Sequence, residues 1–359
     1  MPPTAATLVR NSTYRFEASE ACLDFQEQAR DLGLVDWDSS VVQPCVLVVT
    51  RAADMEMSAL SLAMAEQDIP VARLDADRCL HRPTTIQTDQ PHLRLGGWSL
   101  RPLLLWRRHF NLTGIRVDHH GLHGAYAVDS WGAFVSWLDQ RTDYGHVNDP
   151  TVCRGLDRMT QLQLARQVGL RVPRTIVTTQ PMNALTELPS ANGWIVKTLG
   201  DHFLEVDPGT YHGIFPTRLT RDTAVPDATE AGPVIVQEFL PARYEVRAYV
   251  VGDRLLSYRV AKSTAADLWE QPDSVAVAPC QLPSALSDAL LAFARAGHLD
   301  IGAIDLLAVD GQYVFLEVNL SGDWRWFEQR AGTTDVSDAV RDWIAGRFLR
   351  LRDALPDRA

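Results

Sequence analysis

The chain has 359 residues, enough for two or three domains with sizeable cores, and its apolar fraction of 46% and charged fraction of 22% are those of an ordinary globular protein. A formal net charge of −11 argues against bulk nucleic-acid binding and suits a basic or peptide partner. Five scattered cysteines, no signal peptide and no apolar run of membrane-spanning length predict a reduced, cytoplasmic protein without a membrane partner.

The first half of the chain predicts an N-terminal extension followed by an α/β domain. Residues 1–44 are expected to form the extension, with a short helix over 19–30 and no functional interpretation. A strand at 46–49, a helix at 57–65 and a strand at 71–75 indicate a βαβ unit, hence a parallel sheet in a domain spanning 45–148. Residues 50–54 follow the first strand without the G-x-G-x-x-G pattern, which argues against a dinucleotide site.

Two groups of basic side chains in this half have alternative interpretations. Arg107 and Arg108 end a strand at 103–108, where they could bind an anion or be surface charges. His119, His120 and His123 lie among glycines, and a zinc site would need a fourth ligand, so we expect loop histidines of open function.

The second half predicts an α+β arrangement with an antiparallel sheet. A helix at 154–168 is followed by strands at 174–178, 194–198, 234–240, 244–251 and 254–260, and helices are expected at 284–298 and about 336–351. Residues 200–213 form a polar stretch suited to a mobile flap. We expect a central subdomain at 149–233 and a C-terminal subdomain at 234–359.

A hairpin near the C-terminus carries the clearest candidate for chemistry. Strands at 302–308 and 313–319 flank a turn signal at 309–312, and their alternation predicts Asp305, Glu317 and Asn319 on one face, together with Phe315. This face requires Asp305 opposite Glu317 across a three-residue or bulged turn. A tight Asp-Gly turn would pair Asp305 with Leu316, so the pattern argues against it. Two carboxylates and an amide oxygen suit Mg²⁺; the alternative is a solvent-facing polar side of the sheet.

Lys197 ends the strand at 194–198, but Ile195 and Val196 precede it where a P-loop needs glycine. The order of parts over roughly 150–345 instead resembles the ATP-grasp superfamily of carboxylate ligases. The resemblance implies an ATP-grasp fold, α/β and α+β, behind an N-terminal parallel-sheet (pre-ATP-grasp) domain, and ATP and Mg²⁺ as cofactors.

The resemblance also implies roles for residues of this chain. Arg158, where the family usually has lysine, and Lys197 would hold the phosphates, and Arg247 and Arg259 would face the transferred phosphoryl group. Glu245 replaces the commoner aspartate of an Asp-x-Arg motif. The segment that lines the adenine through backbone groups would be Gln237, Glu238, Phe239 and Leu240, and the metal ligands would be Asp305, Glu317 and Asn319.

The ending at 319–326, Asn-Leu-Ser-Gly-Asp-Trp-Arg-Trp, is similar to the Asn-Pro-x-Gly-x-Trp-x-Trp of ligases that mature ribosomal peptides, the graspetide or microviridin-type branch, with Leu320 in place of proline. That branch implies ester or amide crosslinks between side chains of a precursor peptide bound through its leader and core. A homodimer is left open. Two alternatives remain, a ligase of free amino acids or small carboxylates and a non-catalytic nucleotide-binding scaffold, the latter suggested by Arg158.

Overall fold

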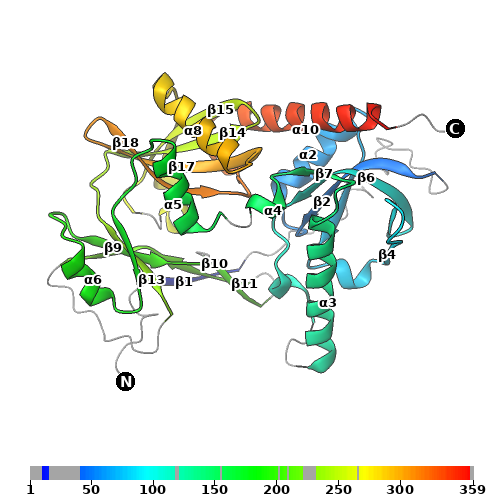
Figure 1. Ribbon diagram of the computed structural model, residues 1–359, viewed down its shortest axis with the longest axis horizontal. Helices are drawn as coiled ribbons and strands as arrows, with labels where there is room; N and C mark the ends of the chain where they lie inside the picture. Colours follow the sequence, from blue (N-terminus) through cyan, green and yellow to red (C-terminus); the bar gives the residue numbers. More distant parts are fainter. Residues whose placement is uncertain are drawn as a thin grey trace.

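The computed structural model describes residues 10–15, 41–117, 121–153, 156–200, 203–207, 210–220, 232–264 and 267–355. Within these ranges the strands form four sheets, arranged as an N-terminal part beside a central and a C-terminal part (Figure 1). The helix expected at 19–30, His119 and His120 lie outside the described residues.

The N-terminal sheet has the order β3-β2-β6-β5-β4, with β7 beside β6. The strands are β2 (Gln43–Thr50), β3 (Val71–Asp75), β4 (Thr84–Ile86), β5 (Leu93–Leu95), β6 (Trp98–Arg107) and β7 (Gly145–Val147). Strand β2 is parallel to β3 and β6, and β6 to β7, which confirms the predicted βαβ unit. Its helices are α2 (Met55–Ala65) and α3 (Leu122–Asp139), with short 3₁₀ turns η3 (Cys79–His81) and η4 (Leu112–Gly114).

The central sheet is antiparallel, with the order β12-β9-β13-β8. Its strands are β8 (Thr175–Thr178), β9 (Trp194–Thr198), β12 (Thr217–Leu219) and β13 (Val234–Glu238), and α6 (Pro181–Glu187) packs on one face. Strand β13 lies in this sheet although its residues fall within the stretch expected for the C-terminal subdomain.

The stretch expected to be an irregular flap is instead a β-hairpin. Strand β10 (Phe203–Asp207) pairs with β11 (Thr210–Phe215), and β1 (Arg10–Arg15) adds to the outer side of β11. The turn between β10 and β11 lies outside the described residues. Alternating side chains with β-branched and aromatic members favour strand pairing here over a loop.

The C-terminal sheet has the order β16-β15-β14-β17-β18 and is antiparallel. Its strands are β14 (Tyr244–Val251), β15 (Arg254–Ala261), β16 (Ala276–Cys280), β17 (Ile301–Val309) and β18 (Gln312–Asn319). Helices α5 (Arg158–Gln167) and α8 (Ser284–Ala296) cover one face. The remaining helices are α4 (Pro150–Cys153), α7 (Asp267–Glu270), η5 (Pro272–Ser274), α9 (Arg325–Ala331) and α10 (Asp335–Asp353).

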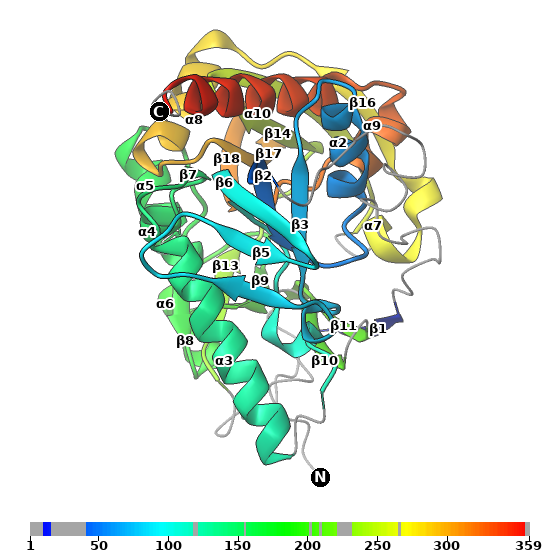
Figure 2. The ribbon, with the colours of Figure 1, turned by 90° about the vertical axis from the view of Figure 1, so that its right-hand side faces the viewer.

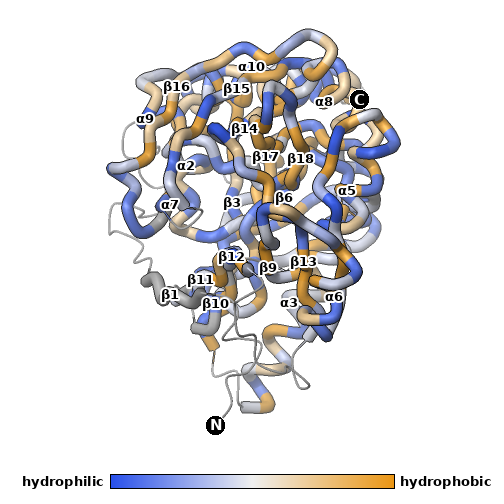
Figure 3. Tube along the Cα trace, turned by 90° about the vertical axis from the view of Figure 1, so that its left-hand side faces the viewer, coloured by the Kyte–Doolittle hydropathy of each residue, from blue (hydrophilic) through white to orange (hydrophobic). Residues whose placement is uncertain are grey.

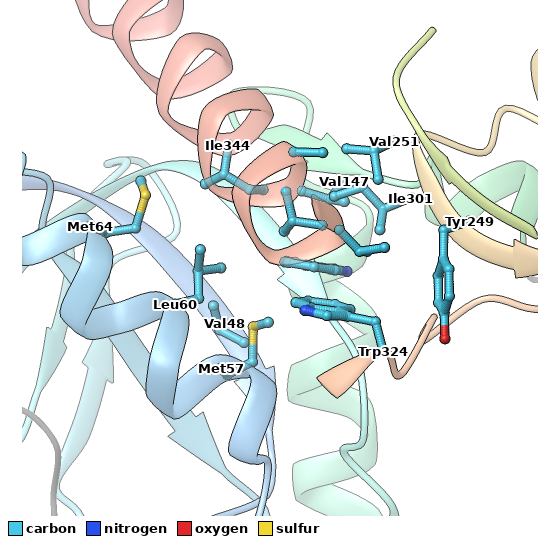
Figure 4. Packing of buried hydrophobic residues seen from close by; sticks show 14 of the residues in the cluster. Val48, Met57, Leu60, Met64, Val147, Tyr249, Val251, Ile301, Trp324 and Ile344 are labelled. Carbon is cyan, nitrogen blue, oxygen red and sulfur yellow. The ribbon is translucent and has the colours of Figure 1, made fainter. Parts of the chain in front are cut away.

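One apolar core joins the N-terminal and C-terminal sheets. Helix α10 lies across both (Figure 2), and its Ile344 belongs to the same buried cluster as Val48 of β2 and Tyr249 of β14. Trp324, 2% exposed, enters this cluster between Met57 and Tyr249 (Figure 4). The hydrophobic stretches of β6, β14 and β17 accordingly gather in the interior (Figure 3). No helix in the described part of the chain has both the length and the apolar character needed to cross a membrane.

Candidate active site

The hairpin of β17 and β18 brings the predicted metal ligands together, but its turn is of the tight type that strand alternation argued against. The turn is the tight Asp-Gly turn, since Val309 pairs with Gln312 and both Asp310 and Gly311 have positive φ. A bulge further along restores the pairing, because Leu306 lies opposite Phe315 whereas Asp305 lies opposite Glu317.

The tight turn, which was predicted to be absent, is therefore present, and so is the predicted shared face of Asp305 and Glu317. The bulge also moves Phe315 to the other face. There it packs in the apolar cluster that contains Val318, not beside Glu317 as predicted.

Asp305 forms an ion pair with Arg247 on the neighbouring strand. The Arg247 guanidinium donates to both carboxylate oxygens, at 3.0 and 2.8 Å, and the Asn319 amide donates to Oδ2 at 3.0 Å. Burial would lower the pKa of Arg247, but the Asp305 charge outweighs it and raises that pKa, so the arginine stays protonated. Rotation of the Asn319 amide would present its oxygen beside Asp305, so the donor set fits a hard cation.

Glu317 faces two cations that come from other elements. Lys197 of β9 places Nζ 3.9 Å from Glu317 Oε2, and Arg158, the first residue of α5, places Nε 3.7 Å from the same oxygen. Arg158 also donates to the Thr198 carbonyl at 2.7 Å. Lys197 is 7% exposed, and burial lowers its pKa, with the Glu317 charge opposing and the Arg158 charge adding to that shift. The structure thus joins the two predicted phosphate-binding residues to the β17–β18 hairpin, which carries the predicted metal ligands.

Glu245 lies on the same face of β14 as Arg247 and has a partner that the sequence analysis missed. Lys262, just after β15, places Nζ 2.8 Å from Glu245 Oε2. Burial raises the pKa of Glu245, while Lys262 opposes the shift and the charges of Asp305 and Glu317 add to it. These last effects place Glu245 in the same electrostatic cluster. The signal in the sequence was composition, because Lys197 and Lys262 are the only two lysines of the chain.

The expected adenine segment begins in β13 and continues into the connection between β13 and β14. Gln237 is 4% exposed and donates to Thr175 Oγ1 at 2.9 Å. It lies on the same face of β13 as Ile235, which pairs with Lys197 of β9. Glu238 accepts two hydrogen bonds from Arg174, each of 2.9 Å. The Phe239 amide donates to the Gly193 carbonyl at 2.9 Å, and Leu240 follows in the connection to β14.

Arg259 does not join this cluster. It pairs with Val246, whose side chain belongs to the core covered by α5 and α8, whereas Arg247 pairs with Tyr258 on the opposite face. The Arg259 guanidinium is exposed and lies 4.4 Å from the centre of the Tyr244 ring. The prediction that Arg259 faces the phosphoryl group is wrong, because strand alternation turns it away.

Arg108 of the N-terminal part connects to the segment that follows the β17–β18 hairpin. Its fully buried side chain forms ion pairs with Asp54, at 2.9 Å, and with Asp323, at 2.7 Å, and donates to the Ser321 carbonyl. It is neither a surface charge nor open to an external anion. A cavity of about 690 Å³ adjoins this contact and is lined in part by Arg107, Arg108 and Ser321.

The site has an excess of positive charge, although the whole chain is negatively charged. Four cations gather with three carboxylates, a positive excess in a protein of net charge −11. The members are Arg158, Lys197, Arg247 and Lys262 with Glu245, Asp305 and Glu317. Among the described residues no three histidine, cysteine or acidic side chains are grouped as ligands of one metal ion, so a metal here would also need Asn319 and substrate oxygens.

No known family model matches the chain, and no curated protein sequence matches it. Several solved structures, in contrast, are similar to the chain over most of its length. The macrocyclase MdnC from Microcystis aeruginosa MRC, bound with precursor peptide MdnA, is 21% identical with a TM-score of 0.71, over 84% of this chain and 99% of MdnC. The ATP-grasp ligase PsnB, complexed with minimal precursor, Mg and ADP, is 20% identical with a TM-score of 0.70, over 88% of this chain and 99% of PsnB.

The chain has the ATP-grasp fold. A Chryseobacterium gregarium RiPP-associated ATP-grasp ligase, in complex with ADP and a leader and core peptide, agrees at 20% identity and a TM-score of 0.68, over 88% of this chain and 98% of that one. The predicted fold class is therefore confirmed, including the parallel sheet ahead of the ATP-grasp part.

Proposed function

We propose that this protein is an ATP-dependent carboxylate ligase that crosslinks a ribosomal precursor peptide. An Asp or Glu side chain of the peptide attacks the γ-phosphate of ATP, which gives an acyl phosphate and ADP. A hydroxyl or amine of the same peptide then displaces phosphate, so that an ester or amide forms.

The observation that carries this proposal is the meeting of three parts of the fold at Glu317. Lys197 from the central sheet and Arg158 from α5 both approach its Oε2, and Glu317 lies opposite Asp305 in the C-terminal sheet. Cations from two elements around paired carboxylates suit a polyphosphate bound with a divalent cation between the sheets. A solvent-facing polar strand would not bury a lysine against the neighbouring sheet.

Each side chain has a task in this mechanism. Arg158 and Lys197 neutralise the phosphate chain, and Arg247 stabilises the charge on the group being transferred. A bound Mg²⁺, held by Asp305, Glu317 and Asn319, would supply charge neutralisation and orientation of the phosphates. The β10–β11 hairpin, which contacts η4 of the N-terminal part, would limit water, because a hydrolysed acyl phosphate wastes ATP.

The peptide partner is inferred from structural relatives and surface charge. The MdnC, PsnB and Chryseobacterium structures each contain a precursor peptide. The net charge of −11 suits a basic leader segment. We infer a cytoplasmic location, since the cysteines that the structure describes are free. The divisions at 44/45, 148/149 and 233/234, a homodimer and the adenine segment at 237–240 stay predictions.

A second candidate is a ligase of small carboxylates or free amino acids. The D-cycloserine synthetase DcsG shares the fold at 16% identity and a TM-score of 0.54, over 85% of this chain and 99% of DcsG. The non-catalytic scaffold is less well supported, because burying four cations beside three carboxylates is costly without a ligand to bind.

ADP release in the presence of ATP and Mg²⁺ tests the proposal. Candidate peptides encoded by neighbouring reading frames are added in one series and an amino-acid mixture in another. We expect peptide-dependent ADP release and a peptide mass that falls by one water per crosslink. Turnover with amino acids alone would favour the second candidate, and nucleotide binding without turnover would favour the scaffold.

A further inference from the structure

A histidine–aspartate pair lies where the N-terminal part meets the segment that follows the β17–β18 hairpin. His109 follows β6 and Arg108, and its Nε2 lies 2.9 Å from Asp323 Oδ1. Asp323 comes four residues after Asn319, in the connection from β18 to α9. The resemblance to ATP-grasp ligases assigned no role to either residue.

The aspartate of this pair is held in place through both its side chain and its backbone. Arg108, whose side chain is fully buried, donates to Asp323 Oδ1 at 2.7 Å, and Tyr249 donates to the Asp323 carbonyl at 2.8 Å. Because an ionised carboxylate only accepts hydrogen bonds, the Nε2 atom of His109 must carry the hydrogen. The Nδ1 atom of the neutral ring then has a lone pair and can take a proton. The His109 side chain is 19% exposed, so part of it is open to solvent.

The pair is connected to the residues that bind the transferred group. Tyr249 lies two residues after Arg247 on the same face of β14, and the Arg247 guanidinium is 5.7 Å from the centre of the Tyr249 ring. Arg108, which binds Asp323, also lines the cavity that contains Ser321 in its wall.

We propose that His109 is the general base of the second chemical step, and that Asp323 is its positioning residue. This inference rests on the proposed function. His109 Nδ1 removes the proton of the acceptor hydroxyl or amine while the acceptor oxygen or nitrogen forms a bond to the acyl carbon. The bond from that carbon to the phosphate oxygen breaks, and inorganic phosphate leaves with the electron pair. The imidazolium then returns its proton to phosphate or water.

Several charged groups face His109 and set its environment. Arg108 precedes it, Asp323 binds its ring, and Asp54 lies close enough for the His109 charge to affect its titration. Burial would raise the pKa of Asp54, but the charges of Arg108 and His109 outweigh it and lower that pKa. Glu56 on α2 lies near Asp323, and burial and the Asp323 charge raise its pKa.

The test separates the two half-reactions with a variant that keeps the hydrogen bond. In His109→Gln the side-chain amide can still donate to Asp323 but cannot accept a proton at neutral pH. Hydroxylamine traps the acyl phosphate as a hydroxamate, ADP release reports the first step, and peptide mass reports the second. We expect crosslinking to fall by about 10²–10⁴-fold, with ADP release and hydroxamate retained. Exposed His81 provides the matched control, His81→Gln, which should behave as the unchanged protein does.

Asp323→Asn provides a second variant, which should weaken crosslinking less than His109→Gln does and shift its pH profile. Nucleotide affinity confirms that each variant is folded. The inference is overturned if His109→Gln crosslinks at the normal rate, or if ADP release falls in parallel with crosslinking, which would indicate a structural role. If the unchanged protein itself forms neither ADP nor hydroxamate, the proposed function fails and the role of His109 fails with it.

Discussion

Replacing Lys197 by methionine should remove activity without removing stability. Lys197 Nζ meets Glu317 Oε2 at 3.9 Å. A unit negative charge of the substrate at that separation would interact with the ammonium by about 4 kcal/mol at an effective dielectric constant of ~20. If this interaction is made mainly in the transition state, its loss lowers the rate of ADP formation by roughly 10³-fold.

Although Lys197→Met should lower activity, it should keep or raise the stability of the fold at neutral pH. Burial lowers the pKa of Lys197 below its ordinary value of 10.5, so below its folded-state pKa the buried charge costs stability. That cost fades as pH rises from the folded-state pKa towards 10.5. Lys197→Met should therefore have a thermal midpoint at neutral pH equal to or above that of the unchanged protein, with the difference shrinking at high pH.

The assay combines steady-state ADP release over a range of ATP concentrations with thermal melts at several pH values. Arg254→Met serves as the control, since Arg254 is an exposed cation of the C-terminal sheet outside the cluster, and it should change neither quantity. A folded Lys197→Met protein that keeps ADP formation within tenfold of normal would refute the role given to the lysine. A marked fall in its midpoint would refute the account of the buried charge.

Three further predictions address other parts of the account. Reductive methylation with a carbon-13 label should give two lysine resonances, because the chain has only two lysines. The resonance lost in Lys197→Met should titrate with a pKa below 10.5, and a pKa at or above that value would contradict the effect ascribed to burial. Arg259→Ala should keep normal ADP formation because Arg259 lies on the other face of the sheet, and a loss above tenfold would restore its original assignment. Asn148→Ala should lower the free energy of unfolding by about 3–5 kcal/mol, since the amide makes four hydrogen bonds to backbone groups of Asp300, Ile301 and Leu320. Exposed Asn183→Ala is the control in denaturant unfolding, and equal midpoints for the two variants would contradict the assignment.

Strand periodicity and motif order predicted most of the architecture. The parallel strands at β2 and β3 and the position of Lys197 on β9 follow from short apolar runs with clear turn signals. Periodicity could also place Asp305 and Glu317 in one hairpin. It could not find the bulge at Leu316, because a bulge leaves no regular signal in alternation and its position depends on packing against α5 and α8.

The contacts that could not be predicted from the sequence join residues far apart in the chain. Arg108 and Asp323 are 215 residues apart, and their ion pair depends on how the N-terminal sheet lies against the C-terminal one. His109 gave no motif of its own. Arg259 shows the converse error, since a motif-based role was assigned without asking which face of β15 the side chain occupies.

The central claim is that this site activates a carboxylate by phosphorylation. Peptide with isotopically heavy oxygen in its Asp and Glu side chains tests it directly when the inorganic phosphate formed with ATP is analysed by mass spectrometry. We expect one heavy oxygen to pass from the peptide to phosphate for each crosslink, with ADP as the nucleotide product. Crosslinking with only light phosphate, or with AMP as the product, would contradict the account.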